Sequence, residues 1–170
     1  MLQTAREAAL EAGRVQLRFY GKLKLSEIGQ KSKNDFVTKV DKLCEKVIIR
    51  RILKKYPTHS IRAEESGVTQ GDGNCWIIDP LDGTSNYIHQ FPMFSVSIGV
   101  THKGRLVAGV VYDPLHREMF TAVSGQGAFL NGRRFHVSKI KKLAVSMMST
   151  GIPFRARNRF AQYFRSLKTI

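Results

Sequence analysis

Residues 95–114 read SVSIGVTHKGRLVAGVVYDP, and this stretch indicates the fold class of the chain. Two runs rich in valine and isoleucine, residues 94–100 and 105–112, lie on either side of Lys103-Gly104. A short turn containing glycine between two such runs predicts an antiparallel hairpin, because glycine adopts the backbone angles of a tight reversal. The centre of the chain is therefore expected to be an antiparallel sheet.

Further elements are expected on both sides of this hairpin. Turn signals such as GDGN, SGQG and NGRR separate short strands at residues 60–63, 76–78, 119–123 and 128–130. Earlier in the chain, apolar residues recur at three- and four-residue steps over residues 4–20 and 38–56, which predicts two amphipathic helices. Residues 21–35 read as a mobile surface loop. Helices followed by hairpin-linked strands indicate an α+β fold, with helices packed on an antiparallel sheet.

The composition is that of a soluble globular protein, with 42% apolar and 24% charged residues among 170. No apolar run approaches the ~20 residues that span a bilayer, so no membrane contact is expected. Glu7 and Glu11 argue against a signal peptide at the N-terminus. Cys44 and Cys75 are too few for a disulfide framework, which favours a reducing, cytoplasmic location.

The charge is strongly basic and unevenly placed. Lys and Arg outnumber Asp and Glu by 28 to 13, and the 52 residues after Glu118 contain ten Lys or Arg and no acid. A basic surface favours acidic partners such as RNA, although a solvated face would look the same. The segment FRARNRFAQYFR (154–165) could stack on single-stranded RNA. The alternative is an amphipathic helix that packs Phe160, Tyr163 and Phe164 inside.

The chemistry starts at WIIDPLDGT, residues 76–84, where an apolar strand runs into two aspartates. Pro80 interrupts regular strand pairing, so Asp79, Asp82 and the intervening Leu81 carbonyl could address one site. These are hard oxygen ligands of the kind that Mg²⁺ prefers. Gly83-Thr84 would open a short helix, whose N–H groups favour a phosphate. The plainer alternative makes Asp82 a helix cap and Asp79 a turn former.

Two more acidic clusters support the metal-site interpretation. Glu64 and Glu65 end the strand at 60–63, and Thr38 and Asp41 lie where the second helix begins. Thr38 and Asp41 have the spacing of a capping box, and from the first turn Asp41 could also orient a hydroxyl or water. Three acid-bearing element ends could form an all-oxygen site for two or three Mg²⁺ ions that activates water for attack on a phosphate ester. Thr84, polarised by Asp41, would help to deprotonate that water.

Three segments occur in an order and spacing that resembles the inositol monophosphatase family: NDFVTKVD (34–41), AEES (63–66) and WIIDPLDGTSNYIHQFPMFSVSIGV (76–100). The resemblance is strongest to bacterial inositol-1-monophosphatases, a type also implicated in ribosomal RNA transcription and processing. It runs along the whole chain and includes VVYDP, GQGAFLNG and STGIPF. It implies a lithium-sensitive, homodimeric enzyme that uses Mg²⁺ to hydrolyse a small phosphorylated polyol, myo-inositol 1-phosphate. It also implies a sugar-phosphatase-like architecture of αβαβα layers.

The resemblance implies a role for each matched residue. Glu64 and Asp79 would ligate metal, with Asp79 bridging two ions, and Leu81 would add its carbonyl. Asp82 would hold the second metal and contact the substrate. Gly83 and Thr84 would present backbone N–H groups to the phosphate, so the substrate-binding set is Leu81, Asp82, Gly83 and Thr84. Asp41 and Thr84 would activate water, so the catalytic set is Glu64, Asp41 and Thr84. Glu65 would support the site without ligating metal.

The end of the chain departs from the family pattern. Family members continue into a second half with a Trp-Asp motif that completes the second metal site, whereas Trp76 is the only tryptophan here. We therefore expect residues 1–145 to form an α+β domain that binds metal and phosphate. Residues 146–170, which begin like a strand, a turn and a helix, would start a second α/β domain that is largely missing. Two rival hypotheses stay open: a non-catalytic module that binds RNA or the transcription machinery, and an inactive truncated product.

Overall fold

The computed structural model describes residues 1–32, 35–151 and 157–169. Contacts divide the chain into two units, Met1–Phe135 and His136–Ile170. This division falls before the boundary expected after residue 145. That residues 146–170 begin a second α/β domain stays a prediction.

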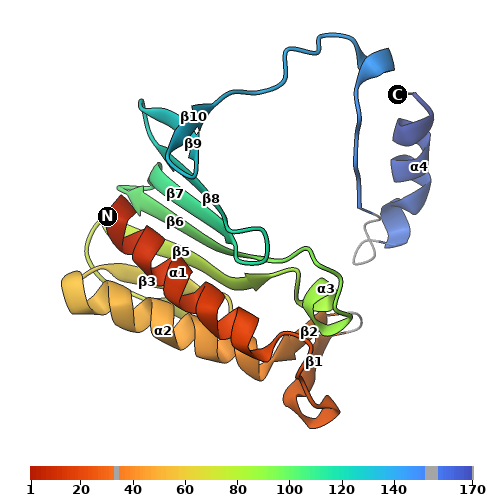
Figure 1. The fold of residues 1–170 in the computed structure, drawn as a ribbon. Coiled ribbons are helices and arrows are strands. Elements are labelled where there is room, and N and C mark those ends of the chain that lie inside the picture. The colour runs from red at the N-terminus through yellow and green to blue at the C-terminus, as the bar shows by residue number, and fades with distance from the viewer. Residues whose placement is uncertain (33–34, 152–156, 170) are drawn as a thin grey trace. The chain divides into compact units, whose positions relative to one another are not determined.

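The first unit is built on an eight-stranded sheet with the strand order β10-β9-β8-β7-β6-β5-β3-β4 (Figure 1). The strands are β3 (Ser60–Ala63), β4 (Gly67–Thr69), β5 (Asn74–Asp82), β6 (Ser95–His102), β7 (Arg105–Asp113), β8 (Glu118–Val123), β9 (Gly127–Leu130) and β10 (Arg133–Phe135). The α+β class is confirmed, but the expectation of a purely antiparallel sheet needs one correction, because β3 and β5 run parallel. The unpredicted strand β4 reverses direction at the outer edge of β3. The chain then reverses again into β5, which consequently runs in the same direction as β3.

The hairpin predicted from residues 95–114 is confirmed. Strands β6 and β7 pair antiparallel, and His102 lies opposite Arg105 across the turn. Lys103 and Gly104 both have positive φ angles, 50° and 77°. These angles match the twist of the flanking strands, which explains why a two-residue turn suffices.

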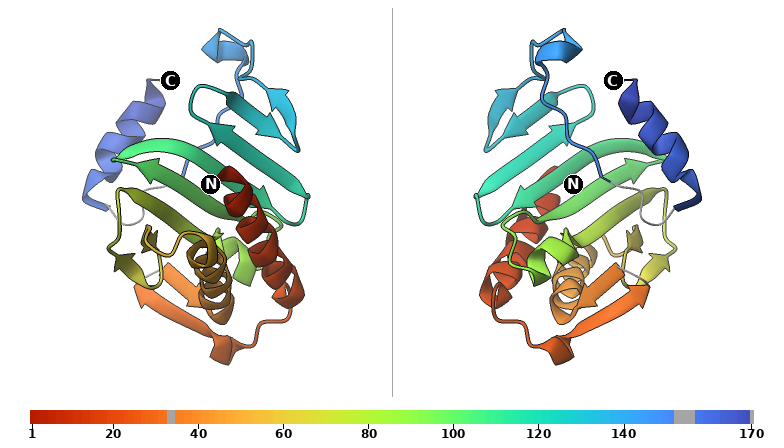
Figure 2. Two further views of the ribbon diagram at one scale, coloured as in Figure 1. Left: turned by 90° about the vertical axis from the view of Figure 1, so that its left-hand side faces the viewer. Right: turned by 90° about the vertical axis from the view of Figure 1, so that its right-hand side faces the viewer.

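Two helices, α1 (Leu2–Phe19) and α2 (Lys39–Lys55), lie side by side on one face of the sheet (Figures 1 and 2). Helix α1 contacts β6 and β7, and α2 contacts β5. The α1 residues Ala5, Ala8, Ala9 and Ala12 are completely buried. Small side chains at these steps let the two helices approach closely, as the apolar periodicity of the sequence predicts.

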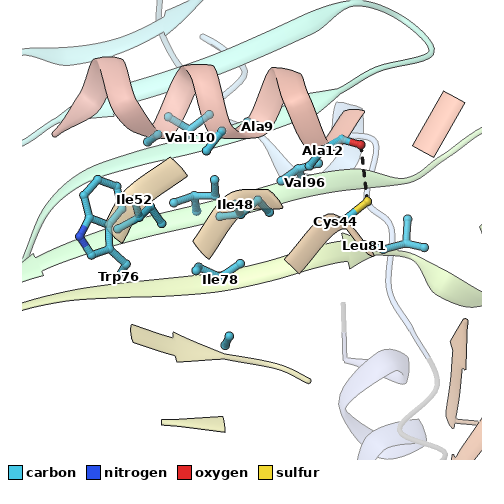
Figure 3. Close-up of a cluster of buried hydrophobic side chains, with 14 of the residues drawn as sticks. Ala9, Ala12, Cys44, Ile48, Ile52, Trp76, Ile78, Leu81, Val96 and Val110 are labelled. Carbon is cyan, nitrogen blue, oxygen red and sulfur yellow. Dashed lines mark hydrogen bonds between the residues drawn. The ribbon is translucent and has the colours of Figure 1, made fainter. Parts of the chain in front are cut away.

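The core lies between these helices and the sheet (Figure 3). Ile48 and Ile52 of α2 pack there with Trp76 and Ile78 of β5 and with Val96 of β6. The buried Trp76 and Ile78 therefore fix the first part of β5, the strand that continues into the two aspartates. The Cys44 thiol is also buried and donates to the Ala12 carbonyl at 3.5 Å, which supports a structural role for this cysteine.

The expectation of an irregular loop over residues 21–35 is wrong. The segment contains a 3₁₀ turn, η1 (Leu25–Glu27), and strand β1 (Ile28–Ser32), which pairs antiparallel with β2 (Asp35–Thr38). Strand β1 pairs with β2 alone, in a separate two-stranded sheet. Its residues, IGQKS, show no apolar alternation, so no periodic signal predicted a strand here. Strand β2 leads directly into α2.

The second unit contains the 3₁₀ turns η2 (Leu143–Val145) and η3 (Arg157–Arg159) and helix α4 (Phe160–Lys168). The helix expected in residues 154–165 is thus present over its described part. None of its described residues is buried, so the expectation that Phe160, Tyr163 and Phe164 pack inside is not met. Their rings contact one another instead. The strand expected near residue 149 lies partly in 152–156, outside the described residues.

Candidate active site

The parallel pairing of β3 and β5 brings two acidic segments together. Ala63, the last residue of β3, lies opposite Ile78 of β5, so the residue after β3 and the residue after Ile78 lie at the same end of this strand pair. The Glu64 N–H donates to the Ile78 carbonyl at 3.2 Å, immediately before Asp79. Glu64 and Asp79, fifteen positions apart in the sequence, are therefore neighbours because of this one strand pairing.

Strand β5 is interrupted where the sequence places Pro80. Its register against β6 shifts between the pairs Asp79–Ser97 and Asp82–Ser95. Proline has no N–H to donate to a ladder, which explains the interruption. The Leu81 N–H turns back to the Asp79 carboxylate at 3.2 Å. The interruption therefore places Asp79, the Leu81 carbonyl and Asp82 on one short irregular segment, as the sequence predicted.

The electrostatics of this segment are unfavourable without a cation. Burial, together with the charges of the neighbouring carboxylates Glu64 and Asp82, raises the pKa of Asp79 to about 7. The main opposing influence on this pKa is the N–H of Leu81. A divalent cation would relieve this repulsion, and carboxylate and carbonyl oxygens are donors that suit Mg²⁺. The donor types of this segment therefore suit the expected metal.

Asp41 and Thr84 meet across 43 positions of sequence. The Thr84 Oγ1 hydroxyl donates to Asp41 Oδ1 at 3.0 Å and lies equally close to the Leu81 carbonyl oxygen. Asp41 is 1% exposed, and burial raises the pKa of its carboxyl group although hydrogen bonds from Thr38 oppose this shift. A buried carboxylate that holds a threonine hydroxyl is suited to accept that hydroxyl's proton.

Thr38 has the capping role that the sequence favoured. Its hydroxyl accepts from the Val40 N–H at 3.0 Å, and its own N–H donates to Asp41 Oδ2 at 2.7 Å. This is a capping box at the start of α2. The box fixes the Asp41 carboxylate through one oxygen and leaves the other, Oδ1, for Thr84.

Gly83 precedes the short helix α3 (Thr84–Ile88), which confirms the helix expected after the aspartates. Its φ angle is 92°, and a Cβ atom built there would lie 2.9 Å from the Met93 carbonyl oxygen. Both the angle and the space disfavour a side chain at this position. Glycine is therefore the residue that suits the position before Thr84.

Two residues at the site were missed by the sequence analysis. Glu45, one turn after Asp41 in α2, is 4% exposed and accepts from the Glu65 N–H at 2.7 Å, which anchors the segment after β3. Its place on the apolar side of α2, four positions from Asp41, was a signal that could have revealed it. Gln16 of α1 donates to the Pro80 carbonyl at 2.9 Å, and no local pattern pointed to it.

A cavity of about 350 Å³ lies beside Asp82 and Gly83. Asn86, Asp113 and Glu118 contribute polar groups to its walls. Across the described ranges 1–32, 35–151 and 157–169, no three His, Cys, Asp or Glu side chains are grouped so that they could hold a metal as they stand. The expected ligand set, Glu64, Asp79, Asp82 and the Leu81 carbonyl, accordingly stays a prediction.

Comparison with known proteins assigns the chain and its fold to a class. The family model described as inositol monophosphatase family matches residues 1–169. The crystal structure of extragenic suppressor protein suhB from Bartonella henselae superposes with a TM-score of 0.91 at 37% identity, covering 98% of this chain and 64% of that one. An inositol monophosphatase from Anabaena gives a TM-score of 0.69 at 42% identity, covering 82% of this chain and 50% of that one.

The chain belongs to the inositol monophosphatase family. Among individual relatives, Nus factor SuhB from Pseudomonas aeruginosa is 44% identical, over 98% of this chain and 65% of the relative. Nus factor SuhB from Escherichia coli K12 is 47% identical, over 96% of this chain and 62% of the relative. The chain thus spans less than two thirds of the length of these relatives. Within its described part, no helix is long and apolar enough to cross a membrane.

Proposed function

We propose that this protein hydrolyses a phosphate monoester, myo-inositol 1-phosphate, with Mg²⁺ as its cofactor in the cytoplasm. The observation that carries the proposal is the hydrogen bond from Thr84 to Asp41, placed next to the Leu81 carbonyl. That pairing joins a proton acceptor to the same segment that bears the proposed metal ligands. Membership of the inositol monophosphatase family supports a phosphatase activity of this type.

Glu64, Asp79, Asp82 and the Leu81 carbonyl would hold the Mg²⁺. When bound, Mg²⁺ supplies positive charge that offsets the phosphate and lowers the pKa of water. The Gly83 and Thr84 backbone N–H groups would orient phosphate oxygens. The Thr84 hydroxyl would take a proton from the attacking water as its own proton passes to Asp41 Oδ1. Burial raises the pKa of the Asp41 carboxyl, which favours this acceptance.

The test is phosphate release from myo-inositol 1-phosphate at millimolar Mg²⁺. Activity should be abolished in Asp82→Asn and strongly reduced in Glu64→Gln, because each change removes a carboxylate charge from the proposed ligand set. Glu65→Gln should lose less activity than Glu64→Gln, because Glu65 is proposed to support the site without ligating metal. Turnover of the unmodified protein no faster than that of Asp82→Asn would refute the proposal. Fructose bisphosphate and a sulfated nucleotide, assayed in parallel, would test the choice of substrate.

The family resemblance also supports two properties of the whole enzyme. We propose that it is a homodimer, which light scattering coupled to size exclusion would measure. We propose further that lithium inhibits it, which the same phosphate-release assay would show as a dose-dependent loss at constant Mg²⁺. A monomer at micromolar concentration, or a rate unchanged by lithium, would contradict the respective proposal.

A second candidate function is a contact with RNA or with the transcription machinery. Two observations favour it: relatives with 44% and 47% identity carry the name Nus factor, and the chain has a net charge of +15. A phosphate-dominated contact weakens steeply as salt rises, because bound counterions are released on binding. RNA affinity that falls with salt and survives Asp82→Asn would support this function. Absent or salt-insensitive binding would count against it.

A further inference from the structure

Gln16 is a completely buried glutamine in the last turn of α1. A buried amide is costly unless hydrogen bonds replace those it made with water. The neighbouring α1 residues Ala12 and Gly13 are also buried but bring no polar side chain. The presence of an amide at this depth therefore needs an explanation in terms of what it contacts.

The amide reaches the interrupted part of β5. Gln16 Nε2 donates to the Pro80 carbonyl at 2.9 Å and to the Ser95 carbonyl at 3.3 Å. Ser95 pairs with Asp82 at the far side of the register shift, and Pro80 lies within it. Both partners are carbonyl oxygens, which only accept, so the NH₂ end of the amide must face them. Gln16 thus supplies donors where the ladder between β5 and β6 lacks them.

The main chain of Gln16 holds a second element of the site. Its carbonyl accepts from the Tyr87 hydroxyl at 2.7 Å. Tyr87 is 1% exposed and belongs to α3, the helix that begins at Thr84. One residue of α1 is therefore bonded both to the segment between Asp79 and Asp82 and to the helix that carries Thr84.

The amide oxygen of Gln16 indicates that the hydrogen bonds made by its NH₂ group are important. Gln16 Oε1 has no hydrogen-bond partner among the described residues. Burying an acceptor without a partner is unfavourable, and an apolar residue of similar size would avoid it. The two bonds made by Nε2 must offset this cost, which points to a demand for donors at the Pro80 and Ser95 carbonyls.

We propose that Gln16 is a positioning residue that fixes the β5 segment from Asp79 to Asp82 in the geometry that binds the cation. The inference rests on the proposed function, because it assigns the segment a metal to bind. Without the two donors, the Pro80 and Ser95 carbonyls would need hydrogen bonds from water. The segment between the aspartates would then sample other conformations. Loss of such a supporting hydrogen bond commonly weakens metal binding by about 10- to 100-fold.

Two measurements on the full chain test this role, with Gln16→Met as the variant because methionine is also unbranched and of similar length. The first is hydrogen exchange of residues 79–84 in metal-free protein, which should become faster in Gln16→Met while residues 96–100 stay protected. The second is the affinity for Tb³⁺ alone, followed by luminescence sensitised through Trp76, which should fall by about tenfold or more. Ile52→Val serves as the control, since it removes one core methylene from α2 without touching Pro80 or Ser95.

The outcomes separate the two proposals. An unchanged rate of amide hydrogen exchange at residues 79–84 in Gln16→Met would overturn the positioning role, whether or not the affinity for Tb³⁺ changes. Unchanged Tb³⁺ affinity, or a loss matched by Ile52→Val, would overturn it too. If the unmodified protein binds no Tb³⁺ and releases no phosphate, the proposed function fails, while the exchange result still decides whether Gln16 orders the segment. Should Gln16→Met not fold, Gln16→Asn keeps the donors but is one methylene too short, and should show the same local effect.

Discussion

At the scale of single residues, the Thr84 hydroxyl is the group whose role can be tested most directly. Thr84→Val keeps the shape of the side chain but removes the proton that Asp41 accepts. We expect kcat to fall by about 10²- to 10⁴-fold, the range for loss of a positioned acid–base group, with a smaller change in KM. Thr84→Ser, which keeps the hydroxyl, should retain most of the activity in the phosphate-release assay. Equal losses in Val and Ser variants would contradict the proton-transfer role.

Gly83 offers a second residue-scale prediction, on stability. An alanine there must adopt a positive φ angle and place Cβ 2.9 Å from the Met93 carbonyl oxygen. Gly125 has a similar φ of 77° but open space around it, so Gly125→Ala isolates the cost of the angle alone. In urea unfolding, we expect Gly83→Ala to lower the free energy of unfolding by about 1–3 kcal/mol more than Gly125→Ala does, the typical cost of overpacking. Equal losses of unfolding free energy in the two variants would show that the backbone near Met93 moves to make room for the added Cβ atom.

At the scale of elements, the turn between β7 and β8 contains an ion pair, Asp113 and His116, whose strength depends on pH. Asp113 Oδ1 accepts from the N–H groups of Leu115 and His116. Its Oδ2 lies 2.7 Å from His116 Nδ1, and this bond raises the pKa of His116. Glu118 raises the same pKa by its charge.

The sign of the pH effect follows from the raised pKa. His116 in the folded protein holds its proton more tightly than in the unfolded chain, so its stabilisation is fully present below the unfolded pKa of ~6.5. It is lost as the pH rises through the folded value. The Tm advantage of the unmodified protein over His116→Ala should therefore be larger at about pH 5.5 than at about pH 8.5. The side chain is exposed, so the effect should be small, and an advantage that grows with pH would contradict it.

Several elements followed from the sequence because their signals are local. Alternating apolar residues and Gly104 predicted the hairpin of β6 and β7, and the alanines of α1 predicted its buried side. Strand β1 was missed because its residues show no apolar alternation. The parallel pairing of β3 and β5 was missed because it depends on β4, a strand of three exposed residues.

At the scale of the whole molecule, all the buried core residues lie in Met1–Phe135, and no described residue beyond Phe135 is buried. The first unit therefore contains a core of its own. We predict that a chain ending at Phe135 unfolds cooperatively, with a Tm within about 4 °C of the full chain, close to the shift that ~1 kcal/mol produces in a chain of this length. Calorimetry of both chains would measure this. Loss of a cooperative transition would show that residues 136–170 stabilise the first unit.

The sequence by itself determined the local features on which the proposed chemistry rests. A strand that ends just before Glu64, a strand that runs into Asp79, a proline that interrupts β5 and a glycine before Thr84 are local features, because each depends on the few residues around it. Only the tertiary structure decided how these groups meet. The parallel strand pair brings Glu64 to Asp79, the Asp41–Thr84 bond joins residues 43 positions apart, and Gln16 reaches Pro80 across 64 positions. Such bonds depend on how α1 and α2 pack on the sheet, and that packing is a property of the whole first unit.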